Sequence, residues 1–131
     1  MTCNICPRAC GVDRENGRMG FCRAPSDFLV AKIMLHKWEE PCISGKSGAG
    51  TIFFSGCNLR CLFCQNCEIS RGDNGEIMTE VQLEKEIFAL VQSGAECIEF
   101  VTPTQNCRTA EKNKAPIEPS CGLEQRRIRE R

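Results

Sequence analysis

Residues 51–64 read TIFFSGCNLRCLFC, an apolar run followed by three closely spaced cysteines. The run Thr51–Ser55 predicts a buried strand, because β-branched and aromatic residues dominate it. Cys57, Cys61 and Cys64 then form a CxxxCxxC motif. A four-iron cluster normally takes four cysteine ligands, so three leave one iron open to a small molecule. The stretch therefore predicts a 4Fe-4S site at which chemistry takes place.

The cysteine content of the whole chain points the same way. Twelve cysteines in 131 residues require either disulfides or metal. The first residues lack the apolar core of a signal peptide, and no segment approaches the roughly 20 apolar residues of a membrane span. We therefore expect a soluble, cytoplasmic protein, in which thiols stay reduced and clustered cysteines bind metal. The formal net charge is zero, which gives no reason to expect nucleic acid, and without a membrane span we expect no membrane partner.

Composition divides the chain into three segments. Residues 1–25 are rich in Cys, Gly and Arg without a hydrophobic period, which predicts a segment that folds around metal. Residues 26–106 carry the regular patterns of a folded domain. Residues 107–131 hold 7 Lys and Arg against 4 Asp and Glu and no amphipathic pattern, which predicts a basic, disordered tail.

The central segment predicts alternating strands and a helix. Phe28–Leu35 is expected to form a strand, and the glycine-rich residues 45–50 a turn before the strand at 51–55. That turn is not a phosphate loop, because a strand follows it where the Walker pattern requires a helix. Thr79 and Gln82 form a capping box that begins a helix. Its apolar positions at helical spacing are Leu83, Ile87, Leu90 and Val91, and Gly94 ends it.

A further strand, Cys97–Val101, completes a strand-helix-strand order. This order predicts a right-handed βαβ unit with parallel strands. Ligands of such units gather at the carboxyl ends of the strands. Both Cys57 and the turn Thr102-Pro103-Thr104 are expected at those ends.

The motif, with the aromatic Phe63 directly before its third cysteine, resembles that of the radical S-adenosylmethionine (SAM) enzymes. The flanking strings HKWEEPCISG (residues 36–45) and GTIFFSGC (residues 50–57) are similar to the pyruvate formate-lyase activating enzyme-like branch. The resemblance covers roughly the first hundred residues. It implies an α/β fold in which the N-terminal cysteine-rich segment precedes the first βαβ portion of a partial (β/α) barrel. Relatives continue with further βα units, so we expect a chain truncated after the second barrel strand.

The resemblance also implies a mechanism. Cys57, Cys61 and Cys64 would hold the 4Fe-4S cluster, and its open iron would be chelated by the amino and carboxylate groups of SAM. An electron would cleave SAM to methionine and a 5′-deoxyadenosyl radical, which abstracts hydrogen from the substrate. The reductant would be a flavodoxin or ferredoxin, and the substrate a protein such as a glycyl radical enzyme. Cluster binding is expected to survive truncation better than turnover, and no residue is assigned as catalytic.

Three residues are candidates for contacting SAM. Phe63 would lie near the adenine, with simple loop packing an equally weighted alternative. Thr102 and Thr104 stand where the family usually has a glycine-rich, acidic motif that binds SAM. Their hydroxyls would bind the amino or carboxylate group of SAM, although turn residues are the more frequent role of such threonines.

A second set of cysteines predicts another metal site. Its members are Cys3, Cys6, Cys10 and Cys22. Four ligands suit a closed site, either structural zinc or an auxiliary cluster. Cys67 is expected to be a spare thiol. His36 would hydrogen-bond near the cluster, with a structural role favoured over that one.

The sequence leaves open two functions of different classes. The first is a radical SAM enzyme of the activating-enzyme-like branch. The second is a noncatalytic zinc or iron-sulfur protein with a structural or electron-transfer role, in which all four metal positions are filled, with Cys67 recruited. A gene fragment without a stable fold is the third reading.

Overall fold

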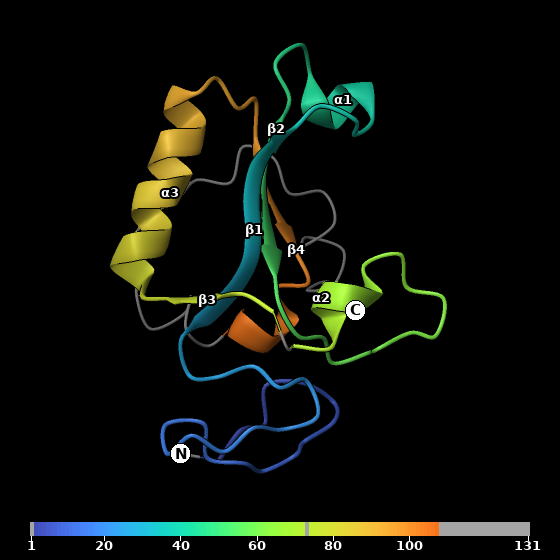
Figure 1. Ribbon diagram of the computed structural model, residues 1–131, viewed down its shortest axis with the longest axis vertical. Coiled ribbons are helices and arrows are strands. Elements are labelled where there is room, and N and C mark those ends of the chain that lie inside the picture. The colour runs from blue at the N-terminus through green and yellow to red at the C-terminus, as the bar shows by residue number, and fades with distance from the viewer. Residues whose placement is uncertain (1, 73, 108–131) are drawn as a thin grey trace.

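The computed structural model describes residues 2–72 and 74–107 (Figure 1). In chain order the elements are β1 (Phe28–His36), α1 (Pro41–Ser44), β2 (Ala49–Phe54), α2 (Cys67–Ser70), β3 (Glu76–Met78), α3 (Glu80–Gln92), β4 (Ile98–Val101) and the 3-10 turn η1 (Thr104–Asn106). The three predicted strands and the predicted helix are all present. No described helix is long and apolar enough to cross a membrane.

The four strands form one mixed sheet in the order β3-β1-β2-β4. β2 and β4 are parallel, with Gly50 opposite Ile98 and Phe53 opposite Val101, as the strand-helix-strand pattern predicts. β1 runs antiparallel to β2, and β3 pairs antiparallel with the beginning of β1. The described residues therefore confirm a mixed α/β fold with a cysteine-rich N-terminal region. The expected relation to a (β/α) barrel stays a prediction.

Helix α3 covers one face of the sheet (Figure 1). It begins with the predicted capping box, in which the Thr79 hydroxyl accepts from Gln82 N and the Gln82 side chain accepts from Thr79 N. Its buried residues Leu83 and Leu90 pack against strand residues that share this face. The core consists of Phe28, Val30, Ile52, Phe54, Leu83 and Leu90. Val91, expected on the apolar side, is 50% exposed because it lies about 100° round the helix from Leu90.

Three short elements have no clear sequence pattern. β3 has only three residues, while α1 and α2 have four residues each. Elements of this length are too short to establish a hydrophobic period. The glycine-rich turn also ends earlier than predicted, since β2 begins at Ala49.

The N-terminal segment is ordered mainly by turns and loops. Thr2 forms an isolated bridge with Asp13, and Cys3 exchanges backbone hydrogen bonds with Val12 (2.8 Å) and Gly11 (3.0 Å). The segment lies at one end of the sheet and α1 at the other (Figure 1). The tail predicted for residues 107–131 lies outside the described residues, except for Cys107.

Candidate iron-sulfur site

The cysteine loop begins where β2 ends. Ser55 and Gly56 lead out of the strand, and the first cysteine, Cys57, is buried with its sulfur 3.4 Å from the backbone nitrogen of Leu59. Because β2 and β4 are parallel, the residues after β4 lie at the same end. The side-chain amide of Gln105 donates to the carbonyl oxygen of Gly56 over 2.9 Å. The predicted neighbourhood of Cys57 and the turn after the second strand is therefore confirmed.

The three motif cysteines differ in burial. Cys57 is buried, Cys64 is half-buried and Cys61 is exposed, and all three are free thiols. The donor set therefore has the chemistry of an iron-sulfur site. Among residues 2–72 and 74–107, however, no group of three His, Cys, Asp or Glu side chains is arranged to hold a metal ion.

The outer part of the loop presents apolar side chains to solvent. Leu62 is fully exposed, Leu59 is 65% exposed and Phe63 is 91% exposed. The alternative in which Phe63 packs within the loop is therefore wrong, because its side chain is not covered by any described residue. Its predicted contact with adenine stays a prediction.

Thr102 and Thr104 lie at the end of β4 but differ in backbone conformation. Thr102 has a φ of 57°, in the left-handed region that non-glycine residues rarely adopt. Thr104 begins η1, and both side chains are half-buried. The geometry agrees with their interpretation as turn residues, and SAM contact by either hydroxyl stays a prediction.

The N-terminal segment packs directly on the cysteine loop. The guanidinium carbon of Arg8 lies 3.6 Å from the centroid of the Phe21 ring, and that of Arg60 lies 4.8 Å from it. Arg8 Nε also donates to the carbonyl oxygen of Asn58 over 2.6 Å. Arg60 and Asn58 both lie between the first two motif cysteines, so the contacts fix this part of the loop against the N-terminal segment.

Glycine permits the closest approach between the two segments. Gly56 has a φ of 81°, and a Cβ atom built there would overlap the carbonyl oxygen of Cys22. A Cβ atom at Gly72 would lie 2.8 Å from Cβ of Arg23. Both contacts are closer than a real Cβ atom tolerates. The packing of the N-terminal segment at Cys22 and Arg23 therefore depends on glycine at these two positions.

The second cysteine set spreads across the N-terminal segment. Cys3 and Cys22 are buried, Cys6 is half-buried and Cys10 is exposed. The thiol of Cys22 accepts from Nη2 of Arg14 over 3.3 Å, and Nη1 of the same arginine donates to the carbonyl oxygen of Gln105 over 2.7 Å. These four thiols do not form a metal-binding group among the described residues. A second metal site, whether zinc or a cluster, stays a prediction.

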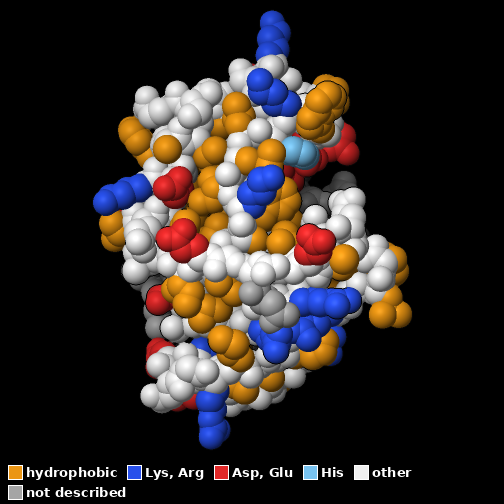
Figure 2. Space-filling model, in the orientation of Figure 1, with side chains coloured by type: hydrophobic (Ala, Val, Ile, Leu, Met, Phe, Trp, Pro, Cys, Tyr) orange, Lys and Arg blue, Asp and Glu red, His pale blue; other side chains and the backbone are white. Residues whose placement is uncertain are grey.

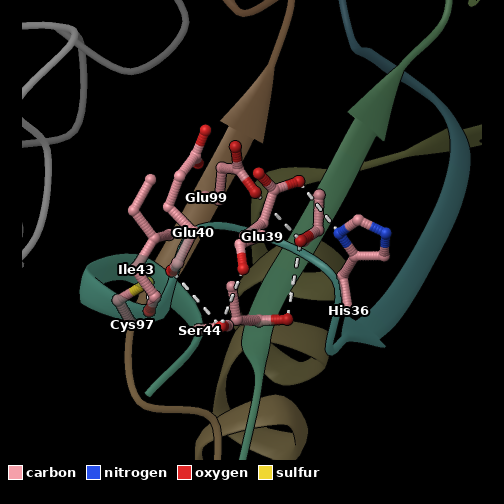
Figure 3. Close-up of polar contacts among 9 residues, drawn as sticks. His36, Glu39, Glu40, Ile43, Ser44, Cys97 and Glu99 are labelled. Atoms are coloured by element: carbon pink, nitrogen blue, oxygen red, sulfur yellow. Dashed lines mark hydrogen bonds and ion pairs between the residues drawn. The ribbon is translucent and has the colours of Figure 1, made fainter.

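His36 lies at the opposite end of the sheet from the cysteine loop. It pairs with Ala49 at the start of β2, so the length of that strand, roughly 17 Å, separates it from the loop. Its Nδ1 lies 2.9 Å from Oε1 of Glu39, and Ser44 donates to the carbonyl oxygen of Glu39 over 3.1 Å (Figure 3). The reading of His36 as a group near the cluster is wrong, and its contacts are those of a structural histidine.

Several residues beside the loop were not found from the sequence. Arg8, Arg14, Phe21 and Gln105 make the contacts just described. Their partners lie up to 91 positions away in the chain, as for Arg14 and Gln105. Neither hydrophobic periodicity nor residue spacing indicates contacts between residues so far apart. The sequence signal that was available for these residues is their nearness to the cysteines.

Comparison with known proteins supports the iron-sulfur reading. Residues 43–103 match the family described as the 4Fe-4S single cluster domain. This match, which includes all three motif cysteines, supports an iron-sulfur protein.

A curated relative matches about half of the chain. The uncharacterized protein MJ0674 of Methanocaldococcus jannaschii is 42% identical over 69 residues, 53% of this chain. The matched part spans 19% of the relative's own length. No solved structure matches the chain significantly.

Proposed function

We propose that this chain holds the cluster-binding part of a radical SAM protein of the activating-enzyme-like branch. The observation that carries the proposal is the placement of a three-cysteine loop at the carboxyl end of β2, beside the parallel β4. The match to a 4Fe-4S domain over residues 43–103 supports the cluster itself. When bound, a 4Fe-4S cluster with one open iron supplies an electron for reductive cleavage of SAM to a 5′-deoxyadenosyl radical.

Different residues of the chain would bind the cluster and the two ends of SAM. Cys57, Cys61 and Cys64 would supply the thiolates. Phe63, exposed on the loop, would stack on the adenine, and the hydroxyls of Thr102 and Thr104 would bind the polar end of SAM. Gln105 would hold the start of the loop through Gly56.

The partners follow from the same proposal. A flavodoxin or ferredoxin would deliver the electron, and a protein such as a glycyl radical enzyme would accept the radical. The N-terminal cysteines would bind zinc or an auxiliary cluster.

A second function is favoured by the position of Cys67. Cys61 and Cys67 line the same hollow of about 200 Å³ beside the loop. Cys67 as fourth ligand would close the cluster, which would leave a structural or electron-transfer role. The two functions differ in whether one iron stays open.

The decisive experiment is anaerobic reconstitution of the full chain with iron and sulfide, followed by counts of iron, sulfide and zinc. Electron paramagnetic resonance of the reduced protein is then recorded with and without SAM. We expect a reduced 4Fe-4S signal that shifts with SAM and is lost in Cys57→Ala. Cys42→Ala, which removes an exposed cysteine outside the motif, is the matched control and should retain both properties. Zinc without iron, or a cluster that is indifferent to SAM, would contradict the proposal.

A further inference from the structure

Helix α3 carries apolar side chains on its outer face as well as on the face that packs on the sheet. Val81, Phe88 and Val91 are 61%, 65% and 50% exposed. Val81 and Phe88 stand seven positions apart, which is nearly two full turns, so they lie in one row along the helix. Figure 1 shows α3 as an outer layer of the molecule, and in Figure 2 apolar side chains and charges of both signs lie together over it. An exposed apolar row bordered by charges is typical of a protein-protein contact.

One charged side chain stands on each side of this apolar row. Glu84 follows Val81 by three positions and Lys85 follows it by four, so they lie on opposite sides of the line from Val81 to Phe88. Both side chains are exposed, and neither forms an ion pair within the part of the chain that the structure describes. Val91 lies on the same side of the row as Glu84. The outer face of α3 therefore presents an apolar row between a negative and a positive side chain.

We propose that this face binds a second copy of the chain, with the two α3 helices parallel. A two-fold axis along the helices places Val81 against Val81, and Phe88 against Phe88, of the other copy. The same axis brings the Glu84 side of each copy onto the Lys85 side of the other, so two pairs of opposite charges flank the apolar row. In an antiparallel pair each side would meet its own like, which places Glu84 near Glu84 and Lys85 near Lys85. Charge complementarity therefore favours the parallel pair.

The contact is small, so the association is weak. Each copy contributes three apolar side chains that are already partly covered in the single copy, which is less than a stable interface buries. We expect a dissociation constant on the order of 100 µM. At the low micromolar concentrations of unfolding experiments nearly every molecule is then a single copy, so stabilities measured there do not include the pair. The pairing goes beyond the proposed function and does not depend on SAM binding.

The test measures self-association of the full, cluster-reconstituted chain by sedimentation equilibrium, at concentrations from about 10 µM to about 1 mM. Anaerobic, reducing conditions exclude dimers that are linked by disulfides. We expect monomer and dimer in equilibrium, and about tenfold weaker association in Phe88→Ser, which loses the largest apolar side chain of the row. Because Phe88 is exposed in the single copy, this variant should fold, and circular dichroism checks that it does.

Exchange of the two charged residues tests the orientation of the pair. Glu84→Lys and Lys85→Glu each place like charges opposite one another, so each should weaken association about fivefold. The variant that carries both substitutions restores opposite charges and should associate as the wild type does. Glu86→Lys is the matched control for Glu84→Lys, because Glu86 is exposed on α3 but lies about 200° round the helix from Glu84.

Three results would overturn the proposal. They are a chain that stays monomeric up to about 1 mM, a dimer that Phe88→Ser leaves unchanged, and a double variant that associates as weakly as the single ones. The first result would leave the outer face of α3 to solvent or to a different protein. A resonance spectrum that is unchanged by SAM would contradict the proposed function alone and leave the pairing intact.

Discussion

The guanidinium carbon of Arg8 lies over the ring of Phe21, 3.6 Å from its centroid, at the contact between the N-terminal segment and the cysteine loop. Arg60 of the loop also lies near the ring, at 4.8 Å. A single aromatic side chain thus interacts with cations from two segments. Since such contacts contribute most when partly desolvated, Phe21 is positioned to hold the segments together.

Replacing Phe21 by Ala should release the N-terminal segment from the loop. We expect a loss of about 1 kcal/mol in the free energy of unfolding and faster hydrogen exchange at residues 8–22. Phe88→Ala is the matched control, because Phe88 is exposed on α3, away from this contact. Exchange rates in Phe21→Ala equal to those of the wild type would show that the contacts of Phe21 with the two arginines do not hold the segments together.

A comparison of two glycines tests the close approach at Gly56. Gly56→Ala combines a left-handed φ with overlap of Cβ and the Cys22 carbonyl, whereas Gly11→Ala has a φ of 62° and open space around its Cβ. The strain alone costs roughly 1–2 kcal/mol, so Gly56→Ala should be destabilised by distinctly more than Gly11→Ala. Chemical denaturation of both variants measures the difference. Equal losses would show that the packing of Cys22 on the loop adapts freely.

Substitution of Cys67 distinguishes a cluster held by three cysteines, with one open iron, from a cluster held by four. If three thiolates hold the cluster, Cys67→Ser should keep the iron content and the spectral response to SAM. Cys64→Ser, three positions earlier in the chain, should lose most of the iron. Iron loss in Cys67→Ser as large as in Cys64→Ser would instead favour the noncatalytic function.

The capping box of α3 should contribute measurably to stability. Thr79→Ala removes the acceptor of the Gln82 backbone and should cost about 1 kcal/mol in thermal or chemical unfolding. Thr79→Ser keeps a hydroxyl and should stay close to the wild type. A Ser variant as unstable as the Ala variant would assign the effect to the methyl group of threonine.

The sequence predicted those parts of the fold that rest on local periodicity and spacing. The helix from Thr79, the strands β1, β2 and β4 and the loop of Cys57 each carry a local pattern that the structure reproduces. The antiparallel pairing of β1 with both β2 and β3 was not predicted, because pairing depends on which hydrophobic faces meet in space.

The surroundings of the site were predicted less completely. His36 lies in a string that resembles the family, yet pairing with Ala49 places it at the far end of β2. The N-terminal segment packs closely at Gly56 and Gly72, where a Cβ atom would meet Cys22 and Arg23. Such packing involves residues far apart in the sequence, which single-chain patterns do not reveal.

The contacts of Gln105 bear on the order of events during synthesis. Its carbonyl accepts from Arg14, 91 positions earlier, and its amide donates to Gly56, 49 positions earlier. Because chains emerge from the ribosome from their N-terminus, the surroundings of Cys57 cannot be completed until residue 105 has been made. Loop closure over such distances is slow compared with local helix formation. Iron and sulfide would therefore bind to a completed cysteine loop only after β4 and Gln105 have been translated.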